Sequence, residues 1–348
     1  MGNNKIFRGV IMFFASVTVV MGFVSIFSRI GGYFSQPVNR VIAETTQTER
    51  VTSAATEKNE KSIAPSQKIS VSKGEKNADV QPTTSSGKNY PVNEVQYGKD
   101  GIVYKNISVK NYTSHSVDVA SEIKKKLGFK IKDSHQVQVL IFHTHSCESY
   151  LKDDTGYYPE DYYPRTTNDK ENVVSVGDKI AKELKKAGIG VIHAKNHHDY
   201  PSYNGSYDRS YETIIDYMNK YKNIKVVLDI HRDSIGLGGE SGKTKPVFKI
   251  DGKKAAQIMI MTGNEYEGGG DFPFWRDNLR FAIKLQKTAE DMFPGITRPL
   301  NFGDYTYNLN VCNGSLLIEV GTDANTLEEA QRTGAMLGKA LARVLQNN

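Results

Sequence analysis

The chain has 348 residues, a formal net charge of +6 and only two cysteines. Two cysteines, Cys147 and Cys312, exclude a disulfide framework and an all-cysteine zinc cluster. They can form one bridge, although two free thiols are expected. The basic residues are scattered, so no nucleic-acid partner is indicated, and an anionic cell-wall polymer or a membrane surface fits the mild charge better.

The first 31 residues are expected to form a short cytoplasmic segment and a membrane anchor. Residues 9–27 are apolar or small and carry no charge, and about 20 such residues span a bilayer as a helix. Lys5 and Arg8 before this stretch favour a cytoplasmic N-terminus. A cleaved signal peptide is the alternative, but its best cleavage site lies far beyond the apolar stretch. The sequence therefore predicts a single-pass membrane protein with an extracytoplasmic catalytic domain.

Residues 32–92 are expected to form a flexible linker between the anchor and the catalytic domain. Most of this segment is rich in Ser, Thr, Lys, Glu, Gln and Asn, with almost no aromatic residues. Such a segment cannot bury enough apolar surface to offset the entropy lost on ordering. Residues 93–348 hold nearly all the strand-like runs and are expected to form one catalytic domain.

An opening region, residues 93–133, has short β-type pieces and an expected helix near residues 118–127. Strands are then expected at residues 137–142, 189–193, 225–230, 255–261 and 315–320, and helices at 172–187, 207–222, 275–292 and 326–345. Asn325 is the expected N-cap of the last helix. Alternation of strands and helices with short connections predicts an α/β fold with a mostly parallel central sheet and helices on both faces.

Three of these strands end in side chains that bind metals or move protons. They are His143, His145 and Glu148 after residues 137–142, His231 after residues 225–230, and Glu319 after residues 315–318. In open α/β sheets, ligands gather at the carboxyl ends of the strands. The pattern therefore indicates one hydrolytic metal site at this edge of the sheet.

A catalytic zinc ion needs three protein ligands and one open position for a water molecule. His145, Glu148 and His231 supply such a set, and the first two are three residues apart, which places both on one side of a turn. His143 is the alternative to His145, because alternation along the strand decides which of them faces the cleft. The remaining histidine is expected to support a ligand or to contact the substrate.

Glu319 is the expected general base, which takes a proton from the attacking water and passes it to the leaving amine. Arg232 is expected to stabilise the oxyanion or to hold a substrate carboxylate. A structural salt bridge is the alternative for Glu319. Asp229 and Asp233, on either side of His231, can orient an imidazole or form structural ion pairs.

Other polar and aromatic runs do not point to a second chemistry. Residues 236–244 resemble a phosphate-binding loop, but that motif needs glycine at the position of Leu237 and a helix afterwards, where a strand-like run follows. His197 and His198 lie in a polar loop and are expected to be exposed. The tyrosine-rich residues 150–163 can form either a substrate-stacking rim or a packed loop.

Four segments in this order resemble the stage II sporulation protein P family: HTHSCES, NVVSVGDKIAKELKKAGIGVIH, VVLDIHRDS and YNLNVCNGSLLIEVGTDANTLEEA. The resemblance covers about residues 102–345, and also the anchor and linker in front. Members are similar to zinc-dependent N-acetylmuramoyl-L-alanine amidases, which cut the amide between the glycan and the stem peptide of peptidoglycan. The resemblance implies Zn²⁺, metal-site residues in HTHSCES and at His231, and Glu319 as the catalytic acid/base.

The same resemblance implies where the protein acts. Family context places it in the engulfment step of endospore formation, between the mother-cell and forespore membranes, beside a lytic transglycosylase, the stage II sporulation protein D. A zinc carboxypeptidase or endopeptidase acting on stem peptides is the enzymatic alternative, with Arg232 as the candidate partner of a terminal carboxylate. A non-catalytic wall-binding module is the other alternative, although no ligand and no base is missing.

Overall fold

The structure is a computed structural model, and it describes residues 87–132, 136–266 and 270–347. The expected membrane anchor at residues 9–27 and nearly all of the expected linker lie outside these residues. Within the described residues, no helix is both long and apolar enough to cross a bilayer.

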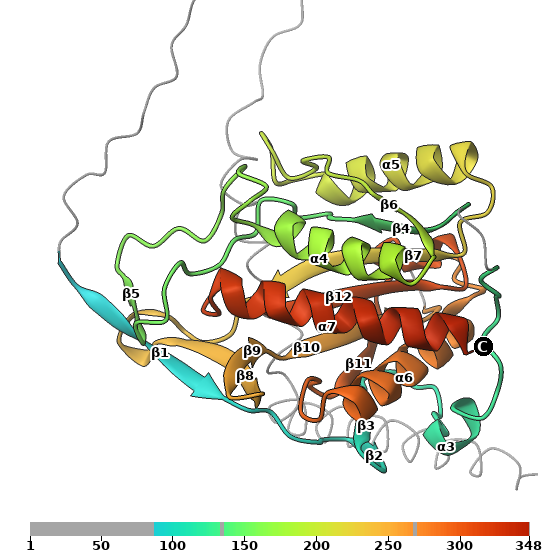
Figure 1. The fold of residues 1–348 in the computed structure, drawn as a ribbon, viewed down its shortest axis with the longest axis horizontal. Coiled ribbons are helices and arrows are strands. Elements are labelled where there is room, and N and C mark those ends of the chain that lie inside the picture. Colours follow the sequence, from blue (N-terminus) through green and yellow to red (C-terminus); the bar gives the residue numbers. More distant parts are fainter. Residues whose placement is uncertain (1–86, 133–135, 267–269, 348) are drawn as a thin grey trace, which may run out of the picture. The chain divides into compact units, whose positions relative to one another are not determined.

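An eight-stranded sheet forms the centre of the fold. Its strands are β2 (Ile102–Tyr104), β3 (Ile107–Asn111), β4 (Val137–Phe142), β6 (Gly190–His193), β7 (Val226–Asp233), β10 (Ile258–Gly263), β11 (Leu300–Gly303) and β12 (Ser315–Thr322). They lie in the order β2-β3-β11-β10-β12-β7-β4-β6 (Figure 1). Neighbours run parallel except at β2–β3 and β10–β12. The α/β fold is therefore confirmed, with a mixed sheet in which parallel pairs predominate.

A second, four-stranded sheet was not expected. It consists of β1 (Asn89–Val95), β5 (Tyr157–Pro159), β8 (Lys243–Ile250) and β9 (Lys253–Ala256), in the order β5-β1-β8-β9. The single strand expected at residues 255–261 is therefore wrong, because the chain passes from one sheet to the other at Gln257. The side-chain amide of Gln257 donates to the carbonyl oxygens of Tyr97 and Gly295, which holds the chain at this crossing point.

Helices cover both faces of the large sheet. Figure 1 shows α4 (Val173–Lys186), α7 (Leu327–Gln346) and α6 (Trp275–Met292) side by side across one face. The fourth helix, α5 (Ser206–Lys220), packs on the opposite face through Ile214. These four helices begin and end within two residues of their expected bounds. The helix expected at 118–127 is a single turn, α3 (Val119–Glu122), so that prediction was too long.

The ends of the helices show which local signals were correct. Asn172 caps α4 by accepting a hydrogen bond from Val174 N–H, and Gly188 follows the helix with a φ of 78°, as the stop residue requires. The N-cap of α7 is Thr326 and not Asn325. The Thr326 hydroxyl accepts from Glu329 N–H while the Glu329 carboxylate accepts from Thr326 N–H, which forms a capping box.

The loop at residues 236–244 contains a 3₁₀ turn, η1 (Gly239–Ser241), and a second such turn, η2 (Leu309–Val311), precedes β12. Strand β8 begins at Lys243, where a phosphate-binding loop would begin a helix. The rejection of that motif is therefore confirmed.

Side chains on the central strands alternate between the two helix layers. On β4, Val139 and Ile141 belong to the core under α4, α6 and α7, whereas Leu140 and Phe142 pack with Ile214 of α5. On β7, Val227 packs on the α5 side in the same way. This alternation decides to which face the polar residues at the strand ends project.

Candidate metal centre

The residues after β4 and at the ends of β7 and β12 meet at one edge of the large sheet. The register pairs Glu319 of β12 with His231 of β7. The ring centroids of His145 and His231 are 5.2 Å apart. Glu148 reaches the same place, with its Oε2 3.5 Å from His231 Nδ1. His145, Glu148 and His231 therefore lie together, as the first of the two alternative ligand sets requires, beside the expected general base.

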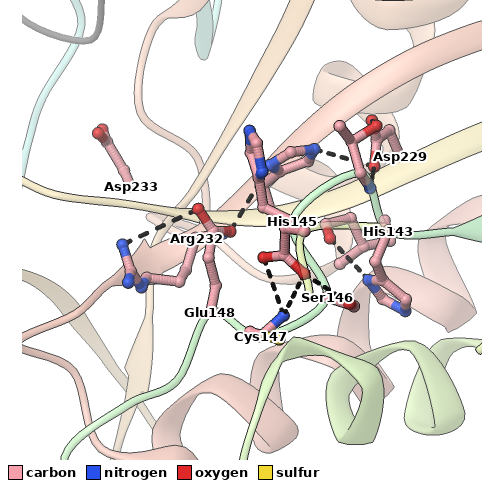
Figure 2. A network of polar contacts seen from close by, with 12 residues as sticks. His143, His145, Ser146, Cys147, Glu148, Asp229, Arg232 and Asp233 are labelled. Carbon is pink, nitrogen blue, oxygen red and sulfur yellow. Dashed lines mark hydrogen bonds and ion pairs between the residues drawn. The ribbon is translucent and has the colours of Figure 1, made fainter. Parts of the chain in front are cut away.

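His143 lies apart from Glu148 (Figure 2). By the alternation of side chains along the strand, it points to the same face as Val139 and Ile141. It is therefore buried on the α4 side of the sheet. Its Nε2 is 2.8 Å from His193 Nε2, and its Nδ1 is 2.7 Å from the carbonyl oxygen of Ile230. Burial, together with the neighbouring charge of His193, lowers the pKa of His143 to about 3. Both ring nitrogens of His143 therefore contact groups other than the three clustered side chains.

His145 is a buried imidazole in an aromatic setting. Tyr203 stacks on it with ring centroids 4.5 Å apart, and Tyr207 meets it edge-on at 5.6 Å. Its Nε2 is 3.2 Å from the Tyr203 hydroxyl, and its Nδ1 is 3.4 Å from Ser206 Oγ. Burial lowers the pKa of His145 to about 4, in spite of the opposing charge of Glu148. The ring is therefore neutral at physiological pH, as a metal-binding imidazole must be.

Glu148 is a buried carboxylate held by Arg232. Its Oε2 accepts a hydrogen bond of 3.0 Å from the backbone N–H of Arg232. Burial by itself would raise the pKa of Glu148, but Arg232 and His231 lower it to about 2. Glu148 is therefore ionised at neutral pH.

His231 lies between two carboxylates. Its Nδ1 faces Glu148, and its Nε2 is 2.9 Å from Asp229 Oδ1, although the direction of approach makes no hydrogen bond. Burial disfavours the charged ring, yet Asp229 and Glu148 outweigh it and hold the pKa of His231 well above its usual value. The pocket between the carboxylates therefore favours a cation, which is a proton when no metal is bound.

Asp229 is the aspartate that contacts His231. It is fully buried, and its two oxygens accept from the backbone N–H of Thr144 at 2.8 Å and from the Thr144 hydroxyl at 2.6 Å. Asp233 instead pairs with Arg298 at 2.8 Å. Of the two aspartates considered from the sequence, Asp229 is therefore placed to orient the imidazole.

The Arg232 guanidinium donates hydrogen bonds to two backbone carbonyl groups of the loop after Glu148. Its Nε donates to the carbonyl oxygen of Ser149 at 3.2 Å, and its Nη2 donates to that of Pro164 at 2.9 Å. Its Nη1 lies 4.0 Å from Glu148 Oε1, and Figure 2 shows the two side chains facing each other. The side chain therefore ties the loop after Glu148 to the end of β7.

Glu319 has one oxygen free for chemistry. Its Oε2 is buried and has no hydrogen-bond partner among the residues that the structure describes. Burial, and next the charge of Asp233, raises the pKa of Glu319 to about 8. A carboxyl group with a raised pKa and an unpartnered oxygen is suited to proton transfer near neutral pH.

The side chains at this edge of the sheet are of the kinds that bind catalytic zinc. In the described part of the chain, no three His, Cys, Asp or Glu side chains are arranged to hold a metal ion. His145, Glu148 and His231 nevertheless offer two imidazoles and a carboxylate, which are ligands of catalytic zinc. His231 Nδ1 faces Glu148, while Nε2 is turned to Asp229. Beside them, Glu319 Oε2 is a buried polar atom without a hydrogen-bond partner among the described residues. The residues present therefore fit zinc by their chemistry.

The family model of stage II sporulation protein P matches residues 22–345. The chain belongs to the stage II sporulation protein P family. It is 31% identical over 205 residues to the stage II sporulation protein P of Bacillus subtilis (strain 168). That alignment covers 56% of this chain and 47% of the relative, so it spans about half the length of the curated protein.

Solved N-acetylmuramoyl-L-alanine amidases are also similar to this family member. AmiC2 of Nostoc punctiforme is 14% identical, with 62% of this chain and 97% of that chain covered and a TM-score of 0.35. The amidase from Clostridium difficile 630 is 16% identical, with 62% and 97% covered and a TM-score of 0.37. The catalytic domain of CwlV from Bacillus (Paenibacillus) polymyxa is 13% identical, with 61% and 97% covered and a TM-score of 0.35. At such scores these matches assign no role to any residue.

Both cysteines of this chain are free. The expectation of two free thiols is therefore confirmed. Burial, with the nearby charge of Asp199, raises the pKa of Cys147 to about 12, so this thiol stays protonated although it lies in the HTHSCES turn.

One loop that positions the HTHSCES turn was missed from the sequence. His198, which was expected to be exposed, is buried, with Nδ1 2.7 Å from the carbonyl oxygen of His143. The next residue, Asp199, accepts from the Ser146 hydroxyl at 2.9 Å and pairs with Arg165. The run His197-His198-Asp199 was the only signal, and a polar loop of this composition is usually exposed.

The tyrosine-rich segment is partly packed and partly exposed. The hydroxyl groups of Tyr150 and Tyr162 donate to the carbonyl oxygens of Val320 and Asp323. Tyr163, in contrast, is an exposed ring. The first two tyrosines therefore fix the loop to the end of β12, as the packed alternative required.

Proposed function

We propose that this chain is a zinc-dependent N-acetylmuramoyl-L-alanine amidase, which cuts the amide between N-acetylmuramic acid and the L-alanine of the stem peptide. The observation that carries the proposal is the meeting of His145, Glu148 and His231 beside the unpartnered oxygen of Glu319. Membership of a family whose members resemble such amidases supports the choice of peptidoglycan as substrate.

In this proposal His145, Glu148 and His231 hold the zinc ion. When bound, zinc would polarise the substrate carbonyl and lower the pKa of the attacking water. His143 is left out of the ligand set because both of its nitrogens face His193 and the Ile230 carbonyl. Its contact with Ile230 instead supports the backbone immediately before His231.

Glu319 takes the proton from the attacking water at its free carboxylate oxygen and gives that proton to the leaving amine. Asp229, fixed by two hydrogen bonds from Thr144, keeps the His231 ring in place. Arg232 was expected to bind the oxyanion or a substrate carboxylate. We propose instead that it positions Glu148, because its guanidinium already donates to two loop carbonyls.

The reaction is tested by mass spectrometry of purified cell wall digested with the full chain. Amidase action frees the amino group of L-alanine and leaves glycan strands that carry no peptide. Shortened peptides that stay attached to muramic acid would favour the carboxypeptidase or endopeptidase alternative. Binding to the wall without any released product would favour the non-catalytic module.

The matched control in that digest is Glu319→Gln, which keeps the shape of the side chain but accepts no proton. We expect this variant to retain zinc and to release peptide about 10²–10⁴-fold more slowly, the usual contribution of a general acid/base. Loss of zinc from a normally folded variant would make Glu319 a ligand and would exchange its role with that of Glu148.

We also propose that residues 1–31 anchor the protein in the membrane and that the residues from 32 up to β1 tether the catalytic domain on the extracytoplasmic side. There it would act in engulfment beside the lytic transglycosylase, the stage II sporulation protein D. The uncharged stretch at residues 9–27 and the family membership support this placement. The expected linker end at residue 92 was too late, because β1 already begins at Asn89.

Alkaline washing of cell membranes tests the anchor. It should leave the full chain in the pellet and release a chain that lacks residues 1–31. Release of both would contradict the anchor.

A further inference from the structure

The ring of His145 is covered by Tyr203. The two rings stack with centroids 4.5 Å apart and planes only 6° from parallel. The Tyr203 oxygen is 3.2 Å from His145 Nε2. Because this oxygen lies in the plane of its own ring, it sits over the face of the imidazole and not in the imidazole plane. The lone pair of a ring nitrogen lies in that plane, so Tyr203 leaves open the direction from which a metal is bound.

The opposite nitrogen of His145 faces a fixed hydroxyl group. Ser206, the first residue of α5, is buried, and its Oγ lies 3.4 Å from Nδ1. Metal-binding histidines usually engage a polar neighbour through the nitrogen that does not bind the metal, and this contact sets the tautomer. A proton on Nδ1 leaves Nε2 as the free ligand atom.

Tyr203 is itself held by Arg165. The guanidinium carbon of Arg165 lies 5.0 Å from the centroid of the Tyr203 ring, a cation–π distance. Arg165 in turn pairs with the buried carboxylate of Asp199. Asp199 also accepts from the Ser146 hydroxyl at 2.9 Å and from the backbone N–H of Cys147 at 3.2 Å.

These contacts form a closed ring. It runs from His145 to Tyr203, Arg165 and Asp199, and returns through Ser146 to the residue next to His145. A closed ring of this kind fixes the plane of the imidazole relative to its own backbone turn. Such support matters because a metal site requires its ligands to be held close to the bound geometry.

We propose that Tyr203 is a positioning residue for His145: its ring holds the imidazole plane, with Nε2 open to a metal ion. The inference rests on the proposed function, because it takes His145 as a zinc ligand. It concerns the aromatic ring of Tyr203, and it predicts that the hydroxyl group is dispensable.

The test is the affinity of the purified full chain for Zn²⁺, measured by competition with a coloured chelator. Tyr203→Ala is expected to weaken zinc binding about 10–100-fold, as loss of a residue that supports a ligand usually does. Tyr203→Phe keeps the stacked ring and should bind zinc as the parent does. The matched control is Tyr211→Ala, which removes an exposed tyrosine of α5 that is 45% accessible and should leave the affinity unchanged.

Circular dichroism and thermal melting establish that each variant is folded. If Tyr203→Ala does not fold, Tyr203→Leu, which keeps bulk but no aromatic ring, takes its place with the same expected loss. Parent-like zinc affinity in the non-aromatic variant would overturn the inference while the zinc site stands. An equal loss in Tyr203→Phe would overturn it too, because the hydroxyl group would then be the active part. A parent chain that binds no zinc would overturn the proposed site and this inference together.

Discussion

Among single residues, Glu319 shows most directly how the fold prepares a side chain for chemistry. Its position in register with His231 places a further carboxylate near Glu148 and Asp233. Burial and the charge of Asp233 make ionisation unfavourable, so the proton is retained up to a pKa of about 8. Without a bound metal, this carboxyl group is therefore largely protonated at pH 7.

This retained proton predicts a pH dependence of stability. The pKa of Glu319 is about 8 in the folded chain against an ordinary value of 4.5. Between these values the folded chain binds more protons than the unfolded chain, so the stabilising contribution is complete below 4.5 and is lost as the pH rises to about 8. Glu319→Gln has no ionisable group at this position, so its free energy of unfolding does not contain this pH-dependent contribution.

Thermal melting of the chelator-treated parent and of Glu319→Gln, between about pH 5 and pH 9, measures this effect. The melting temperature of the variant should rise relative to that of the parent as the pH increases. A difference that stays constant over the range would show that Glu319 ionises in the folded chain as it does in the unfolded chain.

At the scale of elements, α4 lies close to the sheet because Gly177 has no side chain. A Cβ at this position would come within 2.5 Å of His193 Nε2 and 2.9 Å of His143 Nε2. His193 Nδ1 continues the contact to Asp178 at 2.9 Å, on the same helix. The glycine therefore lets the helix pack directly on the histidine pair.

We expect Gly177→Ala to lower the free energy of unfolding by about 1–3 kcal/mol, the usual cost of overpacking a tight core contact. This loss would appear although alanine favours a helix over glycine by about 1 kcal/mol. Urea denaturation measures the change, with Lys182→Ala at an exposed position of α4 as the control. A variant as stable as the control would mean that α4 shifts to admit the methyl group.

At the scale of the whole described domain, a buried lysine joins the two sheets. Lys245 of β8 is only 1% exposed, and its ammonium lies 2.8 Å from Glu94 of β1, 2.6 Å from Asp154 and 3.0 Å from Glu329 of α7. Glu329 also belongs to the capping box of α7. The small sheet is thus tied to a helix that packs on the large one.

Replacing Lys245 with methionine removes the ammonium and leaves the buried Glu329 carboxylate without this partner. Removing one member of a buried ion pair usually costs about 3–5 kcal/mol. The other two carboxylates, Glu94 and Asp154, are each 38% exposed and still form ion pairs with Lys254. The loss of unfolding free energy here should therefore fall at or below the lower end of that range. Urea denaturation beside Lys249→Met, on the exposed side of β8, measures it. Equal stability of the two variants would contradict a role for Lys245 in joining the sheets.

The alternation of the main strands and helices, and the bounds of the four long helices to within two residues, were determined by the sequence alone. The helix expected at residues 275–292 has those bounds in the structure, and β12 delivers Glu319 as its apolar run indicated. These features depend on periodicity, capping and turn residues, which act over a few neighbouring positions. The roles of the ligands and of Glu319, and the membrane anchor, stay predictions.

The tertiary structure alone decided where the chain leaves one sheet for the other, which way β10 runs, and on which side His143 lies. It also brought Tyr203, Arg165 and Asp199 to the turn that holds His145. Each of these outcomes depends on partners many residues away in the chain, such as Gln257 with Tyr97. Local patterning carries no information about such partners, because burial and side-chain pairing exist only once distant segments have packed together.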